Sequence, residues 1–473
     1  MESKQNKKPT ILCMGILDTK GDEIKFLADE ARRLGADAKI MELSLGKEAG
    51  WADISLTEVL AESGLTKEEV FKVSRSDAVA LVGKAGAKKA VKLFEKGEID
   101  GVIAWAGSIG TTVATMVMRA LPMGFPKIMM STLASGDVSS WLGNKDIFIV
   151  NPVAEKGLNV ATKRIARNCT AAIVAMANVS KTPLDEKTKP LVAVTAYGTT
   201  TPAVMRCAEF MENRGWDSIM IHQVGTGATM EDLMRAGQIT AVFDLTIGEL
   251  SNTFYNSIYG ISKEWESERL TAASDMGIPQ IVCPGGLDQC AYGPINTVPQ
   301  SILDEFKSGK RVSYQNSGTP YIHNSAVTIY TPTLEETIIF SKDIIGKLNK
   351  TTGPTLLVIP MRGWSAYDQS AESASVERGW AKENGAGPVW IPDPDNPEWS
   401  YRATTMLSVF KEQINKDNPN LDLMAADMHI LDTEFTDLLT DCMADMLDGK
   451  WKKGLHHDVK GVIVNYDSFY VVM

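Results

Sequence analysis

The feature that most constrains the fold is a regular alternation of short apolar runs with longer amphipathic segments. In the first stretch, Thr10–Ile16 predicts a buried strand, Asp22–Leu34 a helix and Ala38–Leu43 the next strand. Apolar positions recur at helical spacing in the longer segments and continuously in the short ones. Strands separated by helices of about ten to fifteen residues indicate parallel pairing through right-handed crossovers.

The alternation starts a second time after a polar segment. Ser180–Lys189 contains a proline and lacks periodicity, and a new strand and helix follow at Leu191–Thr195 and Ala203–Arg214. We therefore predict an α/β protein of two doubly wound, Rossmann-like parallel-sheet domains, residues 1–184 and 185–473, with a cleft between them. The apolar end of the chain, Gly461–Met473, predicts an edge strand or an arm that contacts a partner.

Composition excludes several classes of protein. The 473 residues carry a formal charge of −11, and 44% of them are apolar, which fits a globular chain without a nucleic-acid groove. No apolar run reaches the ~20 residues that span a bilayer, and the amino terminus lacks the apolar core of a secretory signal. Six cysteines without CxxC spacing fit reduced thiols. We expect a cytoplasmic protein that binds a small molecule, without membrane or nucleic-acid partners.

The first candidate ligand-binding turn follows the first strand. In Gly15–Glu23, Thr19 offers a hydroxyl and Lys20 a positive charge at the start of a helix. Open parallel sheets bind ligands beyond the carboxyl ends of their strands, and helix amino termini favour anions. This turn therefore suits a phosphate or carboxylate. The alternative is a capped turn in which Lys20 is solvated.

Two further turns of the first half have the same character. One provides Gly107, Ser108, Gly110 and Thr111, and the other provides Ser135, Gly136 and Asp137. Backbone amides there can hold a phosphate, although neither a Walker A loop nor a GxGxxG motif is present. The alternatives are a plain tight turn for the former and a surface turn capped by Asp137 for the latter.

The second half offers a different chemistry. Imidazoles and carboxylates at predicted strand ends suit zinc or manganese, and the candidate ligands are His222, Glu249, Asp288 and His323. Of these, Glu249, Asp288 and His323 are the candidate catalytic groups. No HxH or HExxH spacing supports the metal. The alternative is a set of histidines and carboxylates that are hydrogen-bonded at loop ends.

Short motifs spread over nearly the whole chain resemble one family. The sequence is similar to the ATP-binding amino-terminal domain of the tomato mosaic virus resistance protein, a family with uncharacterised bacterial and fungal homologues. The matching segments are GILDTKGDE (Gly15–Glu23), GSIGT (Gly107–Thr111), STLASGDV (Ser131–Val138), YGTTTP (Tyr197–Pro202), DLTIGEL (Asp244–Leu250), PGGLD (Pro284–Asp288) and PMRGWSAYD (Pro360–Asp368). The resemblance implies two α/β domains, ATP with Mg²⁺ in the first domain, and self-association.

The chain departs from that family at Trp105 and Ile109, where smaller residues are usual, and these bulky side chains are expected to narrow or reshape the pocket. Two functions follow as expectations. The first is a protein that binds ATP with Mg²⁺ at the turns of its first domain, coupled to small-molecule metabolism. The second is a metal-dependent hydrolase or C–C lyase that acts on a small carbonyl or carboxylate substrate in the cleft.

Overall fold

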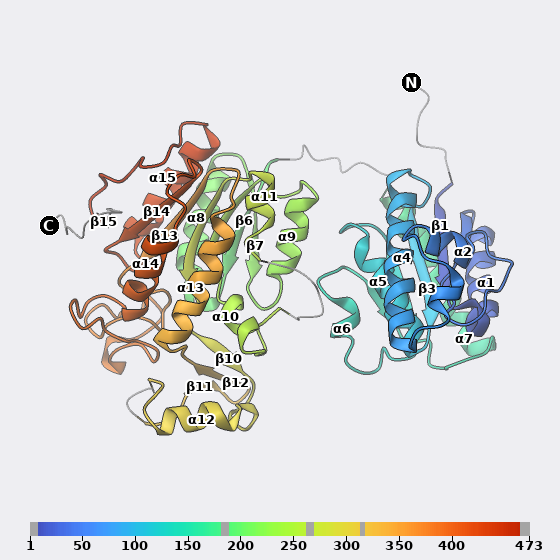
Figure 1. The fold of residues 1–473 in the computed structure, drawn as a ribbon, viewed down its shortest axis with the longest axis horizontal. Helices are drawn as coiled ribbons and strands as arrows, with labels where there is room; N and C mark the ends of the chain where they lie inside the picture. Colours follow the sequence, from blue (N-terminus) through green and yellow to red (C-terminus); the bar gives the residue numbers. More distant parts are fainter. Residues whose placement is uncertain (1–7, 181–188, 262–268, 313–316, 464–473) are drawn as a thin grey trace. The chain divides into compact units, whose positions relative to one another are not determined.

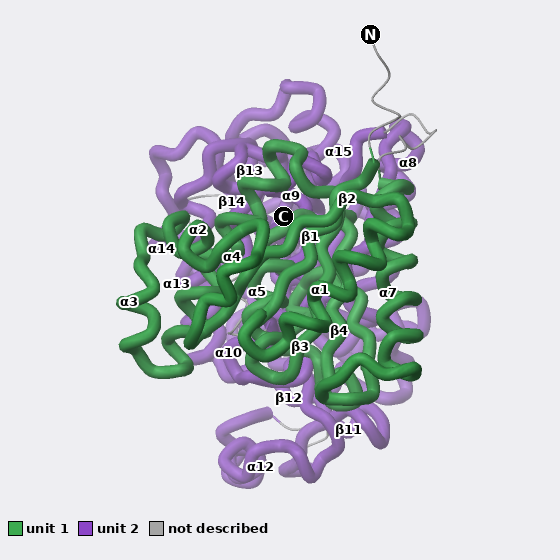
Figure 2. The backbone as a smooth tube through the Cα atoms, turned by 90° about the vertical axis from the view of Figure 1, so that its right-hand side faces the viewer, with its two compact units in different colours: residues 1–187 green, residues 188–473 purple. Residues whose placement is uncertain are grey.

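The computed structural model describes residues 8–180, 189–261, 269–312 and 317–463. The chain divides into two compact units, residues 1–187 and 188–473, coloured separately in Figure 2. Each unit is an α/β domain with helices packed on a central sheet, which confirms the predicted fold class. In the described chain, no helix is both long enough and apolar enough to cross a membrane.

Unit 1 is built on a five-stranded parallel sheet with the order β2-β1-β3-β4-β5. The chain adds β2 on one side of β1 and then places β3, β4 and β5 on the other side. The order therefore reverses between β1 and β3, which makes this pair the switch point of the sheet. The strands are β1 (Thr10–Gly15), β2 (Asp37–Glu42), β3 (Gly101–Ala106), β4 (Lys127–Ser131) and β5 (Phe148–Val150).

Helices cover both faces of this sheet, because alternate side chains of each strand point to opposite faces. In β1, Leu12 and Met14 join the core beneath α2, α4 and α5, whereas Ile11 and Cys13 join the core beneath α1 and α7. The helices are α1 (Leu17–Arg33), α2 (Leu56–Ala61), α3 (Lys67–Val70), α4 (Arg75–Glu95), α5 (Ser108–Ala120), α6 (Ser139–Leu142) and α7 (Val160–Val179).

Unit 2 contains a seven-stranded sheet with the order β15-β14-β13-β9-β8-β6-β7. Six strands are parallel, and β15 joins β14 in the antiparallel direction at one edge. Here the order reverses between β6 and β8. The strands are β6 (Leu191–Ala196), β7 (Asp217–His222), β8 (Ala241–Thr246), β9 (Gln280–Gly285), β13 (Thr355–Pro360), β14 (Leu421–Ala426) and β15 (Val462–Ile463).

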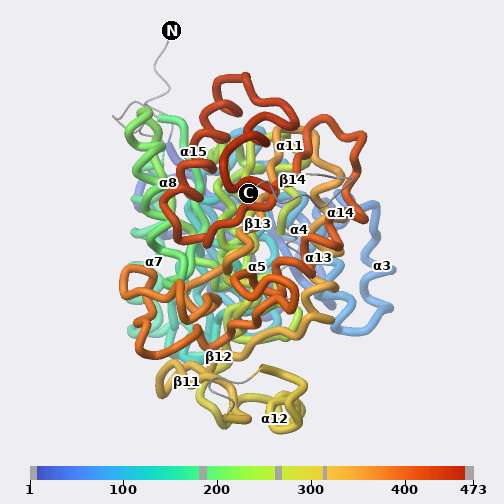
Figure 3. The backbone as a smooth tube through the Cα atoms, turned by 90° about the vertical axis from the view of Figure 1, so that its left-hand side faces the viewer, coloured from blue at the N-terminus to red at the C-terminus, as the bar shows by residue number. Residues whose placement is uncertain are grey.

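Two helix pairs lie on opposite sides of this sheet (Figure 3). One pair is α8 (Thr201–Asn213) with α15 (Thr433–Leu447), and the other is α13 (Leu334–Leu348) with α14 (Tyr401–Gln413). Strand β13 serves both cores, with Leu356 and Val358 on the α8 side. Leu357 and Ile359 lie on the α13 side. The shorter helices are α9 (Gly227–Arg235), α10 (Glu249–Phe254), α11 (Ala272–Met276) and α12 (Gln300–Lys307).

A small antiparallel sheet extends unit 2 beyond the main sheet. Its order is β10-β12-β11, and α12 lies beside it at the lower end of the unit in Figure 1. The strands are β10 (Cys290–Tyr292), β11 (Tyr321–Asn324) and β12 (Val327–Tyr330). The predicted carboxyl-terminal arm contributes β15, and its remaining residues, 464–473, lie outside the described residues.

Candidate functional site

A cavity of about 600 Å³ lies at the switch point of unit 1. The turn after β1 provides Thr19 and Lys20, and the turn after β3 provides Gly107, Ser108 and Gly110. Five of the nine residues predicted to bind the nucleotide therefore line one cavity. It lies beyond the carboxyl ends of β1 and β3, where open parallel sheets bind ligands.

The first turn is held in place by its own polar groups. The Thr19 hydroxyl donates to the Ile16 carbonyl (3.2 Å), and the backbone of Lys20 leaves helical geometry at φ −125° and ψ 20°. The Lys20 ammonium donates to the Glu155 carbonyl and lies 3.8 Å from the Glu23 carboxylate. Lys20 is 6% exposed, so the alternative of a solvated lysine is wrong. Burial follows from the Glu155 loop, which lies over the side chain.

The second turn presents the amino terminus of α5 to the cavity. Gly107 precedes the helix, and no side-chain cap is described for the amides that follow it. A Cβ atom at Gly107 would lie 2.6 Å from the Glu155 Oε1 atom, so the loop approaches because the residue is glycine. These amides carry the partial positive charge of a helix terminus.

Thr111 has a structural role in the same turn. Its hydroxyl lies 2.8 Å from both the Gly107 carbonyl, to which it donates, and the Ser131 hydroxyl. Both threonine and serine are fully buried, so Thr111 ties the end of β4 to the start of α5 rather than facing the cavity.

Both signs of charge surround the cavity. Lys20, Arg75 and Lys156 line it together with Asp18 and Glu155. Burial raises the pKa of the Asp18 carboxyl above its ordinary value, although a hydrogen bond from the Lys47 backbone opposes the change. Cations and helix amides suit phosphate, and carboxylate oxygens suit Mg²⁺.

The third predicted turn and Trp105 lie outside this cavity. Asp137 accepts a hydrogen bond from the Ser139 amide (2.9 Å), which lowers the pKa of its carboxyl. Neither Ser135 nor Gly136 is among the residues that line the cavity. Trp105 packs into the core beneath α1 and α7, because its place in β3 points it to that face. The expectation that Trp105 narrows the pocket is therefore wrong, whereas Ile109 does line the cavity.

Unit 2 contains a smaller cavity of about 340 Å³, and it brings together only two of the four predicted metal ligands. His222 at the end of β7 and His323 in β11 line it, with Tyr197 between strand β6 and helix α8. Glu249 and Asp288 do not line it, because each carboxylate belongs to a separate buried network.

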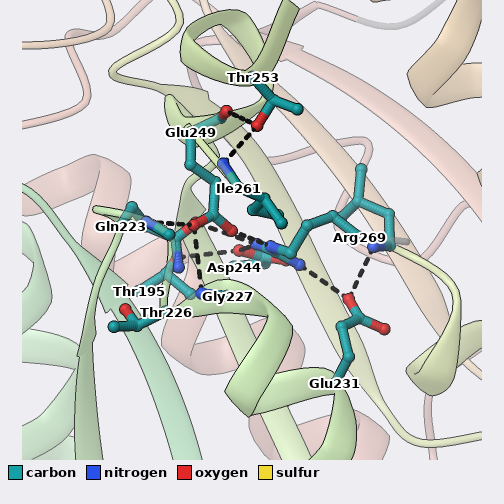
Figure 4. Close-up of polar contacts among 12 residues, drawn as sticks. Thr195, Gln223, Thr226, Gly227, Glu231, Asp244, Glu249, Thr253, Ile261 and Arg269 are labelled. Atoms are coloured by element: carbon teal, nitrogen blue, oxygen red, sulfur yellow. Dashed lines mark hydrogen bonds and ion pairs between the residues drawn. The ribbon is translucent and has the colours of Figure 1, made fainter. Parts of the chain in front are cut away.

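Glu249 binds Arg269, as Figure 4 shows. The Arg269 guanidinium is completely buried and also pairs with Glu231 and Asp244, both at 2.9 Å. Glu249 further accepts the amides of Gly225 (3.3 Å) and Gly227 (3.1 Å). Burial raises the pKa of Glu249, and Arg269 opposes that rise. The network joins β8, α9 and α10, and both Glu249 oxygens accept hydrogen bonds within it.

Asp288 belongs to a second network. Its Oδ2 accepts the Ser365 hydroxyl (2.6 Å), whereas its Oδ1 is buried without a hydrogen-bond partner among the described residues. Burial, reinforced by the neighbouring Asp368 carboxylate, raises the pKa of Asp288 to about 7. Arg402 is buried beside the pair, 3.3 Å from Asp368.

His429 packs against this network as a neutral imidazole. Its Nε2 lies 3.1 Å from the Ser365 carbonyl and 3.2 Å from the Asp368 carbonyl, so Nε2 carries the proton. Its Nδ1 accepts the Leu431 amide (3.2 Å). Burial lowers the pKa of His429 to about 3.

The four predicted metal ligands therefore do not converge. Within residues 8–180, 189–261, 269–312 and 317–463, no group of three or more His, Cys, Asp or Glu side chains is placed to hold a metal. Sequence analysis also missed Arg269, Asp368 and Arg402. No local sequence pattern predicts that these residues are buried. The carboxylates that neutralise each arginine lie far away in the chain.

Comparison with known proteins gives consistent matches. The family model described as "Uncharacterised protein family (UPF0261) N-terminal domain" matches residues 9–182, and that of the C-terminal domain matches residues 189–379. A UPF0261 protein of Clostridium tetani is 34% identical over 447 residues, which cover 94% of this chain and all of the relative. A UPF0261 protein of Rhizobium meliloti is 32% identical, over 76% of this chain and 85% of the relative.

A plant protein is also similar. The ToMV susceptible protein tm-1(GCR26) of tomato is 28% identical over 94% of this chain, which spans 57% of the tomato protein. The ToMV resistance protein Tm-1(GCR237) matches in the same way, at 27% identity. The resemblance to the tomato family therefore extends over both units. The chain belongs to the uncharacterised protein family UPF0261, with both its N-terminal and its C-terminal domain.

Proposed function

We propose that unit 1 binds a nucleoside triphosphate, ATP with Mg²⁺, in the switch-point cavity. The observation that carries the proposal is the meeting of two glycine- and hydroxyl-bearing turns, after β1 and β3, at one cavity. A volume of about 600 Å³ is within the range of small-molecule sites. The likeness to the tomato proteins supports the same ligand, through the ATP-binding domain that the resemblance implies.

The residues of the cavity fit the parts of this ligand. The first amides of α5 and the cations Lys20 and Lys156 suit the phosphates. Asp18 and Glu155 offer the oxygen atoms that Mg²⁺ prefers. When bound, Mg²⁺ would neutralise phosphate charge beside these two carboxylates, which would otherwise repel the phosphates.

Calorimetry with ATP, with and without Mg²⁺, tests the proposal. Lys156→Met should weaken binding by about 1.5–3 kcal/mol, the range for charge-assisted hydrogen bonds. Lys88→Met is the matched control, because Lys88 is an exposed lysine of α4 that does not line the cavity. An absence of heat and of any thermal shift at millimolar ATP would refute the function.

Metal-dependent hydrolysis or C–C cleavage has less support from the arrangement of the residues than nucleotide binding has. That function needs a metal held by some of His222, Glu249, Asp288 and His323, and the two carboxylates are held in separate networks.

We also infer that the protein self-associates through its carboxyl-terminal arm. Val462 and Ile463 form β15 at the edge of the main sheet. The segment from Val462 to Met473 is apolar and contains one charged residue, Asp467. An apolar edge strand promotes pairing with a second chain. The family resemblance implies the same association.

A further inference from the structure

The cavity of unit 2 is a second candidate ligand site, independent of the nucleotide site. It lies at the carboxyl ends of β6 and β7 and against the small sheet, and its volume is about 340 Å³. Its walls are mostly rings and small aliphatic groups. They are formed by Tyr197, Tyr259, Tyr367, Ala291, Val327 and Ile329.

The ring of Tyr197 is fixed by glycines of two strand-end turns. A Cβ atom at Gly286 would lie 2.6 Å from the Tyr197 Cδ2 atom, and one at Gly248 would also collide with the ring. The His222 ring meets Tyr197 edge-on, with centroids 6.1 Å apart. These contacts make the wall rigid before any ligand binds, which lowers the entropic cost of binding.

The hydrogen bond between Tyr367 and His323 orients one donor. The Tyr367 hydroxyl lies 2.8 Å from the His323 Nδ1 atom. A phenol carries its proton at neutral pH, and at this distance it can donate that proton to Nδ1. In the tautomer that this hydrogen bond favours, the ring proton of His323 lies on Nε2, which is a donor.

A second donor is fixed in the same manner. The Gln289 amide donates to the Thr199 hydroxyl oxygen (2.6 Å), and both residues line the cavity. Because that oxygen already accepts a hydrogen bond, the Thr199 hydroxyl is left to donate its own proton. Among the described residues, neither the Thr199 hydroxyl nor the His323 Nε2 atom donates to another side chain, so both can donate to a ligand.

The lining also limits the charge of a ligand. Among the described residues that line this cavity, none is aspartate, glutamate, lysine or arginine. A charged group of either sign would therefore lose its hydration without gaining a counter-charge, so the lining favours a neutral ligand. A flat ring would instead pack against the aromatic walls.

We propose that this cavity binds a small planar ring that bears a neutral carbonyl-type acceptor, such as a carboxamide. Thr199 and His323 donate to the acceptor, and Tyr197 and Tyr259 pack against the ring. Tyr367 acts as a positioning residue, since it sets the tautomer of His323.

Titration of the full-length protein with three probes tests the chemistry. Benzamide should bind and raise the melting temperature, and benzoate, which presents its acceptor with a negative charge, should bind more weakly. Benzylammonium has the same ring but only donors, and it should bind at least about tenfold more weakly, as expected when a hydrogen-bonding group is mismatched. Equal binding of all three probes, or of none, would overturn the proposal.

Variants locate the site. Thr199→Val and His323→Phe should each lower the affinity for the bound probe by about tenfold, the effect of one lost hydrogen bond to a polar ligand. Thr240→Val is the matched control, because Thr240 precedes the amino-terminal end of β8 and does not line the cavity. Unchanged affinity in both cavity variants, or competition by ATP, would contradict this placement.

Discussion

Asp288 holds its Oδ1 atom in the protein interior without a partner among the described residues. Its pKa in the folded state is about 7, against an ordinary value of 3.8. Between these values the unfolded chain has lost the proton that the folded protein keeps. This contribution to stability is therefore fully present below about pH 4 and is lost as pH rises to about 7.

Asp288→Asn should remove the loss of stability that Asp288 causes as pH rises, because the amide carries no charge and retains an acceptor for Ser365. Relative to the unmodified protein, the variant should gain about 2 kcal/mol of unfolding free energy between about pH 5 and pH 7. Urea unfolding at the two pH values measures the gain. A difference that does not change with pH would contradict the raised pKa.

His429 should act in the opposite direction. The pKa of His429 in the folded state, about 3, lies below the ordinary value of 6.5. Between pH 6.5 and pH 3 this histidine therefore gains a proton only in the unfolded chain. Its contribution is therefore present above about pH 6.5 and is lost as pH falls towards 3. His429→Gln should remove a loss of about 2 kcal/mol between pH 7 and pH 5. The same urea series tests this, with His456→Gln, a partly exposed histidine, as the control.

Gly248 lies at a position where a side chain larger than a hydrogen atom would collide with its neighbours. A Cβ atom there would lie 2.5 Å from the Gly286 carbonyl oxygen, besides its collision with the Tyr197 ring. Gly248→Ala should destabilise unit 2 by about 1–3 kcal/mol, as overpacking does. Gly346→Ala is the matched control, because the added methyl group meets nothing within 4 Å there. Equal melting temperatures for the two variants would mean that the backbone accommodates the methyl group.

Among the elements, α13 has a beginning that the sequence encodes directly. The Thr333 hydroxyl accepts the Glu336 amide (3.2 Å), and the Glu336 carboxylate accepts the Thr333 amide (2.7 Å), which forms a capping box. Arg311 holds the same carboxylate with two nitrogen atoms. Thr333→Ala should cost about 1 kcal/mol of stability, whereas Thr333→Ser should be nearly neutral. Thermal unfolding of the pair distinguishes the lost cap from a general effect of substitution.

Helix α4 shows the limit of such local signals. Apolar residues at helical spacing predict a helix over Ala85–Glu95. In the structure the helix begins at Arg75, where the Ser74 hydroxyl accepts the Asp77 amide (3.2 Å). The early turns contain polar and exposed residues, so their apolar pattern is weak. The antiparallel pairing of β10 with β12 was likewise missed, because it joins Cys290 with Tyr330 across a long stretch of chain.

For the whole molecule, the arm proposal predicts an effect on mass. Deleting Gly461–Met473 should lower the particle mass seen by light scattering, or cause aggregation if the β14 edge becomes exposed. The full-length protein should be at least a dimer. A monomer at micromolar concentration would refute self-association, and a deletion that remains dimeric would refute the role of the arm.

The sequence by itself determined the α/β class and the strand-end turns, because burial of strands and helices on a sheet imposes local periodicity. Only the tertiary structure decided which turns meet. The reversal of strand order between β1 and β3 brings Lys20 to Gly107, and it leaves Asp137 in a turn that does not line the same cavity. The structure also decided that Glu249 faces Arg269, since a buried charge requires a partner and that partner can come from any distance along the chain.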